Sequence, residues 1–324
     1  HAVTMARSRS LHGPYDADPS GPVVTARDDP DWPLQRNGHA DFVESVDGEF
    51  FLVHLCGRPL DGTRLCTLGR ETAIQRLRKT DDGWFRLQGG GHLPELTIDP
   101  PALPLDEPVV VMQHDDFESN ELDSVYQWLR TPYPESFYSL RDTPGRLRLY
   151  GMESPGSLYN QALIARRQTD FAFTASTAID FEPDNFQQMA GLICYYNSCK
   201  FHYLYVSTDD EIGKHLGIMS CEADQTSAVT FPIQDRRIRL SDGPLIWLRA
   251  SVDQARLVFS WSDDGEYWSE IPVQLDQSLL SDEAGIEGGE QFTGAFVGMC
   301  CHDLSGWRKH ADFDFFNYEG KSGH

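Results

Sequence analysis

The stretch FAFTASTAIDFEPDNFQQMAGLICYYNSCKFHYLYVST, residues 171–208, decides the fold class of this 324-residue chain. It holds three segments that are rich in aromatic and β-branched residues, mostly alternate between apolar and polar positions, and are separated by turn residues. This pattern is typical of antiparallel strands. Similar segments lie at residues 145–151, 162–168, 245–253, 255–262 and 311–319. We therefore predict about eight strands that pack as a β-sandwich of the jelly-roll type.

The first hundred residues predict β structure of a different kind. The alternating segments HADFVES (39–45) and EFFLVHLCG (49–57) flank the dipeptide Asp47-Gly48, and a second Asp-Gly pair at 82–83 precedes WFRLQGGG. An Asp-Gly pair between alternating segments is a strong hairpin signal. Helical periodicity is absent from this region, so it is expected to form the antiparallel sheets of a propeller or a barrel.

The boundary between the two parts is expected in the segment PPALPLDEP, residues 100–108. Four of these nine residues are proline, which is too many for a central strand or a helix and typical of an extended linker. We therefore predict two domains, one over residues 1–105 and a sandwich over residues 106–324.

Charge and hydropathy exclude several classes of protein. The chain has 27 Lys and Arg against 50 Asp and Glu, a formal net charge of −23, which repels nucleic-acid phosphates and anionic membrane surfaces. It contains no run of about 18 apolar residues, so no membrane-spanning helix is expected. The first ten residues, HAVTMARSRS, lack the apolar region of a secretory signal, and we expect any such signal to precede His1.

The seven cysteines do not form a recognisable metal or redox motif. No C-x-x-C pair occurs, and an odd number leaves at least one thiol without an intrachain partner. Cys56 with Cys66, and Cys194 with Cys199, are spaced for short disulfide loops. Small buried thiols are the other interpretation, and the spacing leaves both open.

Several long stretches resemble one known family. HAVTMARSRSLHGPYD (1–16), PLQRNGHADFVES (33–45) and FLVHLCGRPLDGTRLCTLGRETAIQR (51–76) resemble the closing blades of glycoside hydrolase family 43. FQQMAGLICYYN, FTGAFVGM and ADFDFFNYE resemble the β-sandwich that follows the five-bladed β-propeller in β-xylosidases and α-L-arabinofuranosidases of that family. The fungal enzymes that release arabinofuranose from arabinoxylan are the members it most resembles.

This resemblance implies an inverting exo-glycosidase, in which one carboxylic acid protonates the leaving oxygen and another carboxylate activates water. In the family these carboxylates lie in earlier blades, the acid within an EGPH-type motif, and no EGPH occurs in this chain. A five-bladed propeller needs roughly 300 residues, judged from four strands per blade, and only about 105 precede the linker. We therefore expect the C-terminal part of an enzyme, with no catalytic residue in this chain.

The expected partners are arabinoxylan or xylo-oligosaccharides and the N-terminal propeller portion of the same enzyme. The enzyme is expected to release single pentoses, arabinofuranose rather than xylose, and to be secreted. No cofactor is required, although the resemblance allows a Ca²⁺ ion at the propeller axis. The alternative is a noncatalytic carbohydrate-binding or structural sandwich.

The resemblance assigns substrate-binding roles to His39, Arg70 and Phe296. His39 corresponds to a histidine that faces the pocket floor and, through water, a cation; the other interpretation is a histidine hydrogen-bonded inside a strand core. Arg70 corresponds to an arginine that reaches into the pocket, where it binds sugar hydroxyls or holds a carboxylate ionised; a surface ion pair with Glu71 or a neighbouring carboxylate is the alternative. Phe296 corresponds to an aromatic at the pocket rim, and ordinary core packing is its alternative.

Four further residues are relevant to the site. Trp307 is an alternative rim aromatic, on a polar loop. Arg58 is interpreted as a structural arginine near a turn. Asp41 and Glu71 adjoin the motifs, but hydrogen bonding to turn backbone or ion pairing explains them better than catalysis does.

Overall fold

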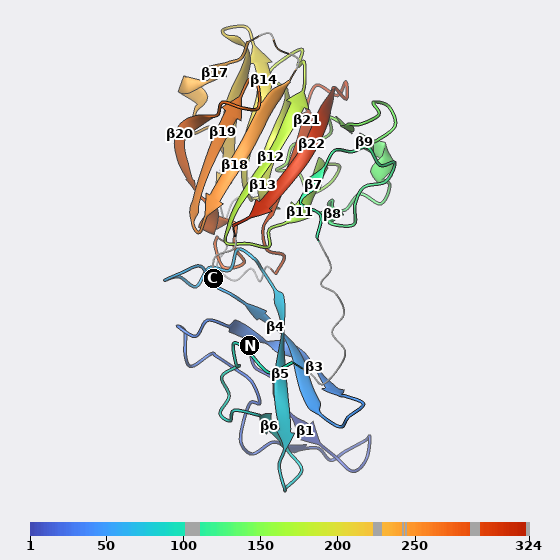
Figure 1. Cartoon of the computed structure of the whole chain (residues 1–324), viewed down its shortest axis with the longest axis vertical. Helices are drawn as coiled ribbons and strands as arrows, with labels where there is room; N and C mark the ends of the chain where they lie inside the picture. Colours follow the sequence, from blue (N-terminus) through green and yellow to red (C-terminus); the bar gives the residue numbers. More distant parts are fainter. Residues whose placement is uncertain (101–110, 223–228, 242, 244, 286–291, 322–324) are drawn as a thin grey trace. The chain divides into compact units, whose positions relative to one another are not determined.

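The computed structural model describes residues 1–100, 111–222, 229–241, 243, 245–285 and 292–321. The chain divides into two compact units, His1–Val109 and Val110–His324 (Figure 1). The predicted linker, apart from Pro100, and the predicted boundary after residue 105 lie outside the described residues. Each unit is considered by itself below.

Unit 1 is built around one four-stranded antiparallel sheet. Its strands lie in the order β3 (Gln35–Glu44), β4 (Phe50–Gly57), β5 (Glu71–Lys79) and β6 (Phe85–Leu87), and a separate pair is formed by β1 (Ala6–Arg7) and β2 (Asp16–Ala17). Both Asp-Gly pairs lie in turns, between β3 and β4 and between β5 and β6, as predicted. A four-stranded antiparallel sheet is the repeating unit of a β-propeller.

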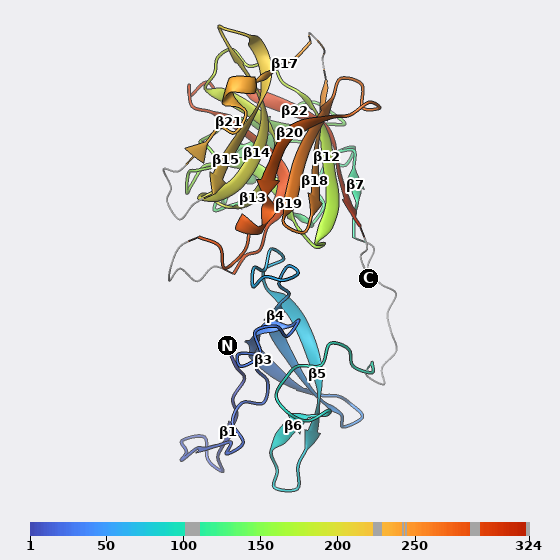
Figure 2. The same ribbon diagram turned by 90° about the vertical axis from the view of Figure 1, so that its left-hand side faces the viewer.

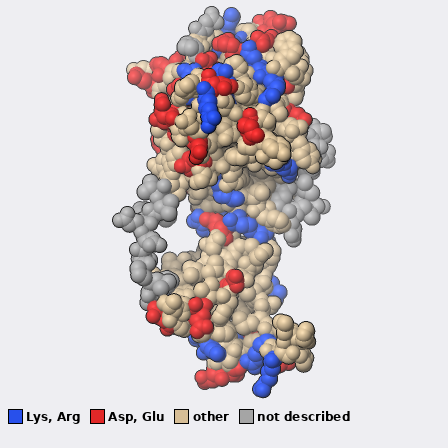
Figure 3. Space-filling model, turned by 90° about the vertical axis from the view of Figure 1, so that its right-hand side faces the viewer, with Lys and Arg blue, Asp and Glu red and all other residues tan. Residues whose placement is uncertain are grey.

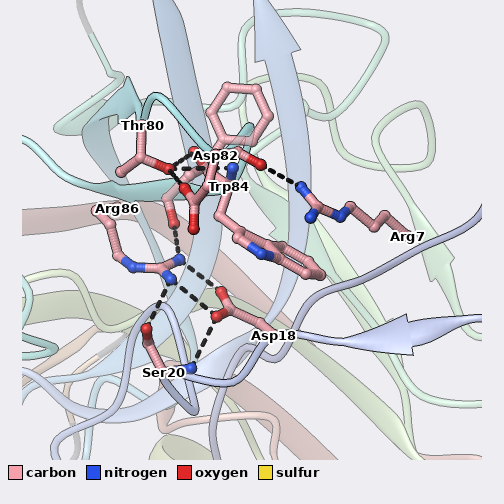
Figure 4. Close-up of polar contacts among 8 residues, drawn as sticks. Arg7, Asp18, Ser20, Thr80, Asp82, Trp84 and Arg86 are labelled. Carbon is pink, nitrogen blue, oxygen red and sulfur yellow. Dashed lines mark hydrogen bonds and ion pairs between the residues drawn. The ribbon is translucent and has the colours of Figure 1, made fainter.

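A charged contact fastens the N-terminal residues to this sheet (Figure 4). Arg86 of β6 donates to both carboxylate oxygens of Asp18, with Nη2 2.8 Å from Oδ1, and to the hydroxyl of Ser20. The Asp18 side chain is almost completely buried. Nearby, the guanidinium of Arg7 lies 4.0 Å from the centre of the Trp84 ring. Because a buried carboxylate is costly unless it is paired, this contact fixes the segment that follows β2.

Unit 2 is a sandwich of two eight-stranded antiparallel sheets, seen as two layers in Figure 2. The first sheet has the order β20 (Ser269–Asp276), β19 (Arg256–Ser262), β18 (Ile246–Asp253), β12 (Ala172–Asp180), β22 (His310–Gly320), β10 (Leu147–Tyr150) and β9 (Tyr138–Ser139), with β7 (His114–Asp115) paired to β22. The second has the order β16 (Val229–Thr230), β15 (Gly213–Glu222), β14 (Lys200–Asp209), β13 (Gln188–Asn197), β21 (Phe296–Asp303), β11 (Ala162–Arg167) and β8 (Tyr126–Gln127), with β17 (Ile238–Arg239) paired to β15.

The core of unit 2 lies between the two sheets. Alternate residues of β13, such as Ala190, Leu192 and Cys194, point into it and are buried. The same alternation directs Ile193 and Tyr195 to the outer face of the second sheet, where they join a smaller apolar cluster. The all-β prediction and the predicted sandwich are confirmed.

All seven cysteines are free thiols, so neither disulfide that the spacing allowed is present. Six of them are buried, and Cys199 is half-buried. Burial raises the pKa of the Cys194 and Cys300 thiols to about 12. They therefore behave as small apolar core residues rather than as reactive groups.

The helices of the described residues are three single 3₁₀ turns, η1 (Pro134–Ser136), η2 (Gln234–Arg236) and η3 (Gln277–Leu279). None is long enough to cross a bilayer, and no other helix occurs in the part of the chain that the structure describes. On the face drawn in Figure 3, Lys and Arg side chains are interspersed with Asp and Glu.

Two buried histidines are expected to make unit 2 sensitive to acid. Burial lowers the pKa of His202 and His302 to about 4, whereas an unfolded histidine titrates near 6.5. As the pH falls from 6.5 towards 4, the unfolded chain binds protons that the folded chain does not, so the free energy of unfolding decreases. We expect a loss of about 2 kcal/mol per histidine between pH 7 and pH 5. Urea unfolding at both pH values checks this, and His202→Gln should reduce the difference.

Gly298 of β21 leaves no space for a side chain against the backbone of β11, and a side chain there should destabilise the sandwich. A Cβ atom at this position would lie 2.2 Å from the Ile164 carbonyl oxygen and 2.4 Å from the Ala165 Cα. Because both are backbone atoms, the strands would have to separate. We expect Gly298→Ala to lower the free energy of unfolding by about 3 kcal/mol, as overpacking does. Gly156→Ala, where the nearest atom is the Ser154 hydroxyl at 3.4 Å, is the matched control.

Candidate functional site

Three of the residues singled out in unit 1 meet at one end of the four-stranded sheet. Gly38 of β3 is paired with Leu55 of β4, and Leu55 is paired with Thr72 of β5. His39 therefore lies at the same end of the sheet as the residues that precede Thr72. Arg58 directly follows β4, and Arg70 directly precedes β5. The register of β4 thus brings His39, Arg58 and Arg70 to one end of the blade.

His39 sits where β3 departs from regular pairing. The register between β3 and β4 shifts on both sides of Gly38, and both Arg36 and His39 have a positive φ, 57° and 47°. Such a conformation is uncommon outside glycine, and an irregularity of this kind re-aims a side chain. The His39 side chain is exposed in this chain. His39 is therefore not buried within the blade of this chain, and its binding role stays a prediction.

Arg58 holds Glu71 in a two-pronged contact. Its Nε donates to Oε2 at 2.9 Å and its Nη2 donates to Oε1 at 2.8 Å. Glu71 is thus ion-paired, as the sequence favoured over catalysis, although its partner is Arg58 and not Arg70. Arg70 itself is half-buried at the start of β5. Asp41 accepts a hydrogen bond from the backbone N–H of Phe42, also as favoured.

A cavity of about 290 Å³ lies along β5 in unit 1. The Arg58–Glu71 pair and Glu95 give it polar walls, and Leu96, Ile98 and Ile74 give it apolar ones. His39 and Arg70 are not among its lining residues. This hollow of unit 1 therefore does not include the two predicted binding residues.

The described residues do not by themselves form a calcium site. Ca²⁺ takes six to eight oxygen ligands, mostly carboxylates and carbonyls. Among the described residues, no three His, Cys, Asp or Glu side chains converge as metal ligands would. His39 offers one exposed imidazole, which fits only a water-mediated contact with an ion whose other ligands come from elsewhere.

In unit 2 an apolar cavity of about 180 Å³ lies at one end of the second sheet. Its aromatic walls are Trp128, Tyr195, Tyr196 and Phe296, and Leu129, Leu163, Ala165, Gln127 and Thr293 complete the lining. Strand pairing explains the assembly, because Phe296 of β21 lies between Arg167 of β11 and Tyr195 of β13. Residues from four distant parts of the chain therefore build one hollow.

Phe296 packs against an apolar cluster and also lines this cavity, and its place at the rim of the active-site pocket stays a prediction. It is half-buried and packs against the apolar cluster on the outer face of the second sheet, and its ring also lines the cavity. The guanidinium of Arg167 lies 5.2 Å from the centre of this ring. An aromatic wall of this kind offers an apolar face to the C–H groups of a sugar.

Trp307 occupies the other end of the same strand. It lies on the turn between β21 and β22 and is 74% exposed. Phe296 begins β21 and Asp303 ends it, a rise of about 23 Å for seven residues. Trp307 therefore cannot replace Phe296 in this cavity.

Three aromatic residues that line the cavity were not predicted as site residues. Tyr195 and Tyr196 belong to MAGLICYYN, where alternation marks a strand but not a binding wall. Trp128 follows β8, a strand of only two residues, and its Nε1 donates to the carbonyl of Thr131. Their common feature is strand pairing between residues far apart in the chain, for which a single sequence gives no signal.

Two family models match the chain. Glycosyl hydrolases family 43 matches residues 1–85, and the beta-xylosidase C-terminal concanavalin A-like domain matches residues 114–319. Among curated proteins, Beta-xylosidase of Bacillus subtilis is 38% identical over 99% of this chain and 61% of its own length. Xylosidase/arabinosidase 43B of Humicola insolens is 41% identical over 98% of this chain and 59% of its own length.

A solved structure has the same fold throughout. The crystal structure of xylan beta-1,4-xylosidase from Bacillus halodurans superposes with a TM-score of 0.93 at 40% identity, over 98% of this chain and 60% of that one. The chain thus spans about 60% of the length of the relatives it matches. The predicted fold class, closing propeller blades followed by a β-sandwich, is confirmed. The chain belongs to glycoside hydrolase family 43.

Proposed function

We propose that this chain is part of a secreted, inverting exo-glycosidase that removes single pentoses from arabinoxylan or xylo-oligosaccharides. The observation that carries the proposal is family membership over both units, at 38–41% identity to relatives named xylosidase and xylosidase/arabinosidase. The excess of acidic residues suits an extracellular enzyme that acts on a neutral polymer.

In this proposal the blade end of unit 1 supplies polar contacts. Arg70 is a permanent cation whose planar set of donors binds sugar hydroxyls or keeps a nearby carboxylate ionised. His39 contributes an imidazole held in an uncommon backbone conformation. Local strain of this kind concentrates at functional sites, which supports a binding role for His39.

The Phe296 cavity supplies apolar contact in the same proposal. Its volume, about 180 Å³, suits a single ring, and its walls are mostly aromatic. Stacking of a sugar ring on such walls excludes water, and exclusion of water strengthens the electrostatic interactions of the reacting groups. None of its lining residues is a carboxylate, so this cavity contacts substrate without supplying an acid or a base.

We place the catalytic carboxylates on propeller sectors outside this chain. Inversion needs two carboxyl groups roughly 6.5–9.5 Å apart on opposite sides of the sugar ring. The blade of unit 1 leaves apolar side chains exposed on both faces, since Phe42 and Val43 are neighbours on β3 and are 38% and 44% exposed. This exposure supports packing against further blades.

For the released sugar we propose arabinofuranose, with xylose accepted at the same subsite. The resemblance to fungal enzymes that release arabinofuranose favours this sugar, and the name of the relative from Humicola insolens contains both xylosidase and arabinosidase. Both sugars are small pentoses that differ little in apolar contact, so discrimination between them depends on hydrogen bonds at the subsite.

The first test is activity with and without the missing sectors. The chain alone is expected to leave 4-nitrophenyl α-L-arabinofuranoside and β-D-xyloside intact, because it lacks the acid and the base. The chain joined to the N-terminal propeller portion is expected to hydrolyse both, the arabinofuranoside faster, and to release the inverted anomer from arabinoxylan. NMR of the fresh product identifies the anomer. Hydrolysis by the chain alone, or retention of configuration, contradicts the proposal.

Removal of the Phe296 ring is expected to weaken substrate binding. In the active form, Phe296→Ala should raise KM about tenfold, which corresponds to about 1.4 kcal/mol of lost aromatic contact. Phe296→Tyr should stay close to the original value. Phe186→Ala is the matched control, since Phe186 is 65% exposed and does not line the cavity. Steady-state kinetics on xylobiose give these values, and an unchanged KM in Phe296→Ala removes this residue from the binding surface.

A further inference from the structure

Lys200 is a lysine buried inside the sandwich, and the proposed chemistry makes no use of it. It begins β14 and is only 2% exposed. Lysine is almost never fully buried unless its ammonium group is paired. The buried ammonium group of Lys200 is therefore expected to have specific partners.

The Lys200 ammonium is held by backbone oxygens and an aromatic ring. Its Nζ donates to the carbonyl of Ser281 at 2.6 Å and to the carbonyl of Ala284 at 2.9 Å. It lies 3.9 Å from the centre of the Tyr196 ring, which is a cation–π contact. Lys200 thereby ties residues 281–284 to strands β13 and β14.

Tyr196 and Asp282 extend this contact to residues 293–294. The Tyr196 hydroxyl donates to Asp282 Oδ1 at 2.6 Å. The backbone N–H of Thr293 donates to that hydroxyl at 3.3 Å, and the backbone N–H of Gly294 donates to Asp282 Oδ1 at 3.2 Å. Residues 281–284 and 293–294, which we call the two stems, are thus held by one network.

This network shares two residues with the lining of the Phe296 cavity. Tyr196 and Thr293 belong to both, and Phe296, which begins β21, lies three residues after Thr293. A shift of the second stem would move the Thr293 wall and the start of β21 together. The geometry of the cavity therefore depends in part on Lys200 and Asp282, which do not line it.

The groups that face Lys200 keep it charged near neutral pH. Burial lowers the pKa of Lys200 to about 8, and the carboxylates of Asp282 and Glu283 and the thiol of Cys199 oppose that effect. A buried charge of this kind is seldom a net source of stability, since its desolvation costs about as much as its contacts return. Its advantage lies in fixing one arrangement of the chain.

We propose that Lys200 is a positioning residue, which with Tyr196 and Asp282 locks the two stems and so sets the walls of the Phe296 cavity. This inference rests on the proposed function only for its effect on substrate. Its structural part concerns the chain alone. The two parts are tested by different measurements, so that failure of one is distinguishable from failure of the other.

The structural part is tested by hydrogen exchange in the 324-residue chain. Lys200→Met keeps the length and apolar stem of the side chain but removes the ammonium group. Tyr196→Phe keeps the ring and removes the hydroxyl, and it serves where Lys200→Met does not fold. In both, peptides that contain Thr293 and Gly294 should exchange about tenfold faster, as expected for the loss of one hydrogen bond of about 1.4 kcal/mol.

The control is Lys214→Met. Lys214 lies on β15 and pairs with the exposed carboxylate of Glu182 at 2.6 Å. It should leave exchange at residues 293–294 unchanged. Equal exchange in Lys200→Met, Tyr196→Phe and the original chain overturns the positioning role, whatever the enzyme does.

The functional part is tested by steady-state kinetics in the active form. Tyr196→Phe should raise KM several-fold and leave kcat within about twofold, because the loss affects binding in the ground state and the transition state alike. A residue with a merely structural role would lower the amount of active enzyme without moving KM. Faster exchange with an unchanged KM would support the positioning role of Lys200 and show that the cavity does not contact substrate.

Discussion

The structure depends on the insertion of the last two long strands into the centres of the two sheets. β21 lies between β13 and β11, and β22 lies between β12 and β10. Asp303 is opposite Gln188, 115 residues earlier in the chain, and Phe313 is opposite Leu147. Closing such large loops costs entropy before any apolar surface is buried. The two halves of each sheet are therefore joined only when residues 296–320 are in place.

The same insertion creates the aromatic cavity. β21 brings Phe296 between Arg167 and Tyr195, and the close passage at Gly298 leaves no room for a side chain there. The stem that precedes β21 is fastened by Tyr196, which lies on the strand beside it. The completed sheet and the cavity thus depend on the same strand pairs, which are distant in sequence.

The features that the sequence could predict are those that depend on interactions between residues close together in the chain. Turns and strands that depend on neighbours, such as the hairpin at Asp47-Gly48 and the strand over Ala172–Asp180, were predicted. The strand Gly213–Glu222 was not, because GKHLGIMSCE opens with glycine, lysine and histidine and has no clear alternation. Of the residues that line the cavity, Phe296 was the one predicted from the sequence. Trp128 and Tyr195 were not, because pairing between distant strands brings them to the cavity.

The two units differ in the side chains that they present. The blade end of unit 1 carries the polar or charged side chains of His39, Arg58 and Arg70, whereas the hollow in unit 2 is aromatic and contains no carboxylate. Hydrolysis with inversion needs an acid and a base at a fixed separation, and an aromatic hollow cannot supply either. Under the proposed function the hollow restricts the orientation of a sugar and keeps water away, while carboxylates outside this chain supply the acid and the base. The proposed positioning role of Lys200 agrees with that function, because a contact that orients a ring loses its value when it moves by about 1 Å.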